Sequence, residues 1–168
     1  MKDQLIEPPK KLKSKVRGVP GGPDPEILEK VNKRIEAVGR SYTQWALKDV
    51  ERLSNLLRDL TPHQPAASKI LDQMFQIALE MRGQGGSFSY PLISEAAKSL
   101  CIFIDALKKI NEFDDTAKEL CKVHSDTIKL ILQKPPEDQN NTVDRQVVAG
   151  LSKATQIYAE RRNLTLCY

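Results

Sequence analysis

Apolar residues recur every three or four positions along this chain from residue 24 onward, and no segment alternates apolar and polar residues one by one. The first spacing places apolar side chains on one face of an α-helix, whereas strict alternation is typical of a β-strand. Proline and glycine divide the pattern into segments of about 20 residues with short connections. We therefore predict an all-α fold whose helices form an antiparallel bundle.

Residues at the ends of these segments predict where the helices start and stop. Asp24, Pro25 and Glu26 favour a helix start, because aspartate caps a helix, proline suits its first position and glutamate complements its dipole. This first helix extends to about Leu60, either unbroken or interrupted near Gly39-Arg40-Ser41. Four more helices are expected: from about 66 to 83, from 91 past 107, from 114 past 131, and over 142–162.

The ends of the chain differ from its middle. Residues 1–23 combine several prolines with a basic cluster and offer few apolar groups to bury. Such a segment cannot offset the conformational entropy that it would lose on ordering. We predict a flexible basic tail at 1–23, one helical domain at 24–162, and a short C-terminal tail at 163–168.

Composition argues against several classes of function. The net charge of +4 and the 5% of aromatic residues do not favour nucleic-acid binding, and no apolar run is long enough to span a membrane. The three cysteines lack a C-x-x-C spacing, and the two histidines, His63 and His124, lie far apart, so neither a disulfide framework nor a metal site is expected. The sequence predicts a cytoplasmic protein with no cofactor and no small-molecule substrate.

The segment 66–86 has two apolar faces when it is drawn as a helix. Ile70, Met74, Ile77, Ala78 and Met81 form a stripe that we expect to face the core. A second group lies on the far side, with Leu79 roughly 150° from the centre of that stripe. This group is expected to bind a partner unless neighbouring helices cover both sides, and it consists of Phe75, Leu79, Arg82, Gly83 and Gly86.

The stretch from Ala78 to Leu92 resembles the signature of histidine phosphotransfer domains, which relay phosphoryl groups between receiver domains in two-component signalling. The family signature has a histidine, two residues, a lysine and a glycine, and then an aromatic residue. Arg82 stands at the lysine position, Gly83 at the glycine and Phe88 at the aromatic residue, while Ser89 replaces a further glycine. The resemblance implies a four-helix bundle over about 41–133, to which the C-terminal helix is an addition.

Position 79 departs from the family signature. The phosphoacceptor histidine would fall there, and the residue is leucine, whose side chain has no lone pair to take up a phosphoryl group. The resemblance then implies no enzymatic activity. It implies a degenerate phosphotransfer module that binds the receiver domain of a response regulator, or a histidine kinase, through its helical surface.

Two other functions stay open. His124 could accept the phosphoryl group in an active relay, although its place on the apolar seam of the fourth helix favours a buried structural histidine. The apolar spot at Leu79 could instead hold a homodimer together. We also expect core positions for Tyr42, Trp45, Cys101 and Cys121.

Overall fold

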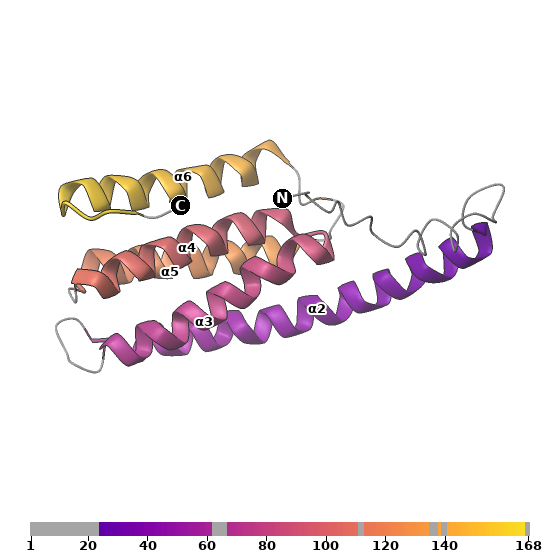
Figure 1. Ribbon diagram of the computed structural model, residues 1–168, viewed down its shortest axis with the longest axis horizontal. Coiled ribbons are helices and arrows are strands. Elements are labelled where there is room, and N and C mark those ends of the chain that lie inside the picture. The colour runs from indigo at the N-terminus through magenta and orange to yellow at the C-terminus, as the bar shows by residue number, and fades with distance from the viewer. Residues whose placement is uncertain (1–23, 62–66, 111–112, 135–137, 139–140, 167–168) are drawn as a thin grey trace, which may run out of the picture. The chain divides into compact units, whose positions relative to one another are not determined.

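The computed structural model describes residues 24–61, 67–110, 113–134, 138 and 141–166, and of 35–40 it describes the backbone alone. The described regular structure is entirely helical, which confirms the all-α prediction (Figure 1). The chain divides into two units, residues 1–37 and 38–168. Its elements are α2 (Pro25–Asp59), α3 (Ala67–Gly85), the 3₁₀ turn η1 (Gly86–Phe88), α4 (Pro91–Ile110), α5 (Asp115–Leu132) and α6 (Thr142–Arg161).

The first unit is described from residue 24, so the predicted basic tail at 1–23 lies outside the described residues. Asp24 begins α2 as predicted, since its Oδ1 accepts a hydrogen bond from the backbone N–H of Glu26 at 2.9 Å. Two exposed ion pairs follow one helical turn apart, Glu26–Lys30 and Glu29–Lys33, each at 2.7 Å. The helix continues through Gly39-Arg40-Ser41, where the sequence left open a break.

Helix α4 is the central element of the second unit. It packs against α3, α5 and α6, and its side chains are buried on nearly every side. Pro91 occupies its first position, where the missing N–H costs nothing. The N-cap of α5 is Asp114, whose Oδ1 accepts from the Ala117 N–H at 2.7 Å. Strong caps and one continuous core therefore fix the helices around α4.

Residues of α2 in the second unit contribute one face to this core. Tyr42 is buried and stacks on Phe88, with ring centroids 4.7 Å apart, and the hydroxyls of Thr43 and Tyr90 lie 3.0 Å apart. The core position predicted for Tyr42 is confirmed. The prediction for Trp45 is wrong, because its side chain is 55% exposed. The buried positions of α2 are Tyr42, Ala46, Val50, Leu53 and Leu57, and Trp45 lies roughly 100° from their centre.

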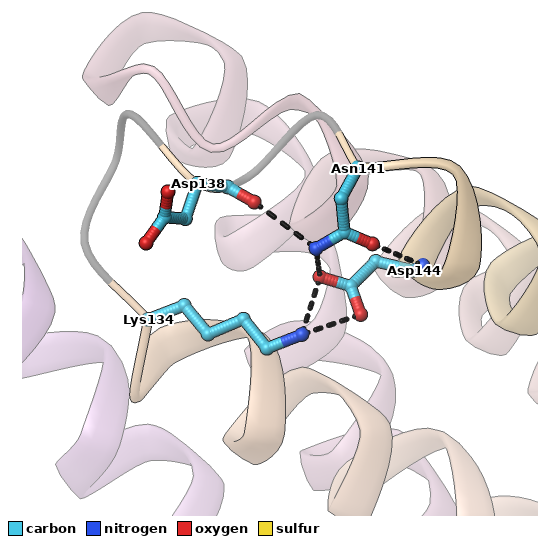
Figure 2. A network of polar contacts seen from close by, with 4 residues as sticks. All are labelled: Lys134, Asp138, Asn141 and Asp144. Atoms are coloured by element: carbon cyan, nitrogen blue, oxygen red, sulfur yellow. Dashed lines mark hydrogen bonds and ion pairs between the residues drawn. The ribbon is translucent and has the colours of Figure 1, made fainter.

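Helix α6 is attached to α5 at both ends. At its start, the Lys134 ammonium lies 2.6 and 2.7 Å from the two Asp144 oxygens, and Asn141 caps the helix through the Asp144 N–H at 2.8 Å (Figure 2). At its end, Arg162 pairs with the Asp114 carboxylate. Beyond the helix, Leu164 packs against the core. Helix α6 packs on both α4 and α5.

The buried face of α6 differs from the one that apolar spacing suggested. Apolar spacing in the sequence puts Val143 and Val147 on one seam with Leu151 and Tyr158, yet both valines are exposed. The buried positions include Asp144 and Thr155, which are polar and carry no hydropathy signal. Their polar atoms are satisfied, Asp144 by Lys134 and Asn141 and Thr155 by the Leu151 carbonyl at 3.0 Å.

A close contact ends α3. A methyl group built on Gly85 would lie 2.8 Å from Ser94 Oγ and 3.0 Å from the Tyr90 carbonyl oxygen, so only glycine leaves room for the following chain. The Gly85 carbonyl accepts from the Tyr90 N–H at 2.8 Å. The same methyl group on Gly83 would meet nothing within 4 Å.

Substitution of these two glycines by alanine is therefore expected to have opposite effects on stability. Gly85→Ala should lower the free energy of unfolding by about 1–3 kcal/mol, because the new methyl group pushes against backbone atoms. Gly83→Ala should raise it by about 0.4–1 kcal/mol, since the unfolded chain loses freedom and no contact is strained. Urea unfolding of the two variants measures both effects, and a shift of the same sign in both would contradict the packing described at Gly85.

None of the described helices has the length and apolar character needed to cross a lipid bilayer.

Candidate partner-binding surface

The burial of α3 has the two-sided pattern that the sequence predicted. Met74, Ile77, Ala78 and Met81 are buried as expected, while Ile70 is only half-buried. Leu71, which was not assigned to the stripe, is buried as well. The opposite side of the helix stays open to solvent, so neighbouring helices do not cover both faces.

Leu79 lies on the open side of α3 with 41% of its side chain exposed. Arg82 and Gly83 follow one turn later and are also exposed, as is Gly86 in η1. The space beside Gly83 is open, because a methyl group built there would meet no atom within 4 Å. A methyl group built on Gly86 would come no closer than 3.7 Å to Ser94 Oγ. We name Leu79, Arg82, Gly83 and Gly86 the α3 surface.

Ser94 holds the backbone under the α3 surface in place. Its hydroxyl donates to the Arg82 carbonyl at 2.8 Å and accepts from the Gly86 N–H at 2.8 Å. One side chain of α4 thus satisfies a carbonyl of the last α3 turn and an N–H of η1. The positions of Arg82 and Gly86 are consequently set by the fold.

Phe75 contributes less to this surface than the sequence predicted. It is half-buried and packs against the core, because its side of α3 is turned toward α4. The Lys108 ammonium lies 5.4 Å from the ring centroid and also pairs with Asp72. Phe75 is therefore a flank of the α3 surface, supported by a cation from α4.

A groove of about 430 Å³ lies between α2 and α3, next to the α3 surface. Gln76 and Glu80 of α3 form one wall and are the neighbours of Leu79 around the helix. Arg52 and Asp59 of α2 line the opposite wall. The sequence does not reveal this groove, because polar residues at helical spacing are equally typical of any solvated helix face.

His124 is fully buried within the second unit. Its Nδ1 lies 2.7 Å from the Leu120 carbonyl oxygen, and its Nε2 lies 3.0 Å from Ser99 Oγ. The carbonyl can only accept, so Nδ1 carries the proton and Nε2 accepts from the serine hydroxyl. Burial lowers the pKa of His124, and the bond to Leu120 offsets this only in part. His63 lies outside the described residues.

The two described cysteines are buried and hold protonated thiols. Burial raises the pKa of Cys101 to about 11, although the Arg82 charge acts against the rise, and burial raises the pKa of Cys121 to about 12. A thiol needs its thiolate form to act as a nucleophile or a ligand. The described residues also contain no group of three or more His, Cys, Asp or Glu side chains that could hold a metal ion.

Comparison of the chain with protein-family models, with curated proteins and with solved structures finds no match.

Proposed function

We propose that this protein is a histidine-phosphotransfer-like module that binds a two-component signalling partner without taking up its phosphoryl group. The partner is the receiver domain of a response regulator or a histidine kinase. The module is an antiparallel four-helix bundle over about 41–133, with α6 as an addition. The exposure of Leu79 carries the proposal, because this residue stands where the resemblance places the phosphoacceptor histidine.

The chemistry of the described side chains favours binding over transfer. Leu79 cannot act as a nucleophile, and Arg82 has no phosphohistidine beside it to stabilise. His124 is buried with both ring nitrogens in hydrogen bonds, so a second protein has no access to either nitrogen. An active relay through His124 is the weaker candidate for this reason.

The α3 surface has the features of a small docking site. Leu79 supplies an exposed apolar group, and Arg82 supplies a cation for an acidic partner site. Open space at Gly83 lets the partner backbone come close to α3. Burial of one leucine side chain stabilises a complex by about 1.5–3 kcal/mol, which is roughly a tenfold to hundredfold gain in affinity.

Calorimetric titration of the purified protein with a panel of receiver domains tests the proposal. We expect binding of at least one receiver, and Leu79→Asp should weaken it by roughly tenfold or more, because the complex would then bury a carboxylate. Leu130→Asp is the matched control, since Leu130 is exposed on α5, which does not contact α3. The affinity of this variant for the receiver should equal that of wild type. No binding by any receiver, or an affinity unaffected by Leu79→Asp, would contradict the proposal.

Incubation with phosphorylated receiver separates binding from transfer. Wild type should acquire no acid-labile phosphate, whereas Leu79→His places an imidazole beside Arg82 and should acquire some. Phosphate on the wild-type chain would support the active relay, and its loss in His124→Gln would assign the acceptor. If the α3 surface instead holds a homodimer together, wild type should have the mass of a dimer in solution and Leu79→Asp the mass of a monomer.

A further inference from the structure

Helix α6 carries two apolar stripes, and the fold buries only one of them. The inner stripe packs on α4 and α5 through Val148, Leu151 and Tyr158. The outer stripe lies roughly 100° around the helix from the inner stripe, which is the angle between consecutive residues. It consists of Val143, Val147, Gly150, Ala154 and Ile157. Its large members are 65%, 45% and 40% exposed at Val143, Val147 and Ile157. Steps of four and three residues keep this outer stripe on one face along the helix.

The outer stripe is nearly symmetric about Gly150. Val143 and Ile157 lie seven residues to either side, and Val147 and Ala154 lie three and four residues away. A methyl group on Gly150 would meet nothing within 4 Å, so the fold of one chain gives no reason for a glycine in this helix interior. A second helix crossing here would use the space, because side chains at the crossing point set how closely two helices approach.

Exposed side chains of opposite charge lie at the two ends of α6. The exposed Asp138 precedes the start of α6, and Figure 2 shows its carboxylate pointing away from the Lys134–Asp144 pair. The exposed Arg161 lies in the last turn of the helix. When two such helices run antiparallel, Asp138 of each chain lies near Arg161 of the other, whereas a parallel pair brings like charges together.

We propose that a second copy of this chain covers the outer stripe, with the two α6 helices antiparallel and a two-fold axis near Gly150. Symmetric placement of the apolar residues, open space at the centre and complementary ends are what an isologous interface requires. A single helix pair is a small contact compared with stable complexes, so the dimer forms reversibly over the micromolar range. The interface is separate from the α3 surface and does not depend on the proposed function.

Sedimentation equilibrium of the full-length chain tests the proposal. Wild type should shift from monomer to dimer with rising concentration, while Val147→Asp and Gly150→Leu should stay monomeric at every concentration. Both substituted positions are exposed, so circular dichroism should show unchanged helix content. Leu79→Asp is the matched control and should dimerise as wild type does. A monomeric wild type, or a dimer that survives Val147→Asp, would overturn the proposal.

Cysteine cross-linking tests the direction of the pairing. In a Cys167→Ser background, Cys101 and Cys121 are buried, so an introduced cysteine reports its own neighbours. Gly150→Cys should form a disulfide-linked dimer under a mild oxidant, because the two-fold axis brings both copies of position 150 together. Val143→Cys alone should form no disulfide-linked dimer, because the two copies of position 143 lie at opposite ends of an antiparallel pair. The double variant Val143→Cys with Ile157→Cys should form one, because position 143 of each chain lies near position 157 of the other. Cross-linking of Val143→Cys alone would overturn the antiparallel arrangement.

Discussion

Phe103→Ala should lower the free energy of unfolding by about 3–5 kcal/mol, the range for an aromatic residue removed from a packed interior. Phe103 is fully buried on α4, and its ring meets Tyr158 of α6 edge to face at 5.3 Å. Its loss leaves a cavity between the central helix and the last helix. Since a domain has about 5–15 kcal/mol of stability in total, the variant should unfold at a much lower urea concentration.

Leu130→Ala is the matched control for this prediction. Leu130 is exposed on α5, and exposed positions change stability by about 0.5 kcal/mol or less. Urea unfolding followed by circular dichroism gives both values under the same conditions. A loss below about 1 kcal/mol in Phe103→Ala would mean that α4 and α6 do not share a packed interior.

As the pH falls, protonation of His124 should destabilise the fold before protonation of the protein's carboxylates does. The pKa of His124 is lowered in the folded protein, whereas the unfolded chain titrates near 6.5. Protonation would bury a charge and turn Nε2 from acceptor into donor toward Ser99. The contribution of neutral His124 to stability is complete above a pH of about 6.5 and falls by up to about 1.4 kcal/mol per pH unit below it, until the folded-state pKa is reached.

Urea unfolding at several pH values between 5 and 8 measures this effect. The stability difference between wild type and His124→Gln should shrink as the pH falls, because the variant has no group to titrate. Equal slopes for wild type and His124→Gln would contradict the burial of an uncharged ring.

Asp114 titrates in a different window. Burial alone would raise its pKa, but hydrogen bonds from Ala117 and Tyr158 and the Arg162 charge bring the pKa below its ordinary value. Its contribution is therefore present above a pH of about 4 and is lost as the pH falls further, below the range assigned to His124.

Helical periodicity predicted the parts of the structure in which one face of a helix is clearly apolar. On α3 the angular spacing alone placed Leu79 outward and Met74, Ala78 and Met81 inward, as the structure has them. The starts of α5 and α6 were also predictable from the sequence, because short polar residues such as Asp114 and Asn141 before an apolar run satisfy free N–H groups.

Periodicity failed where a helix has apolar residues on more than one face. On α6 the apolar spacing assigns Val143 and Val147 to the buried face. The structure instead buries Asp144, which pairs with Lys134 and gives no apolar signal in the sequence. On α2 it placed Trp45 inside, since a large aromatic residue contributes strongly to any apolar stripe. The groove between α2 and α3 also depends on how two helices meet, and neither helix alone contains that information.

The double hydrogen bond of Ser94 has a consequence for the kinetics of any encounter on α3. Because this hydroxyl already fixes the backbone at Arg82 and Gly86, the α3 surface is preorganised, and binding of a partner there would order little of the backbone of this chain. A partner that binds the α3 surface as proposed should therefore associate as a rigid body in a single kinetic phase, and the fit of its own surface should set the lifetime of the complex.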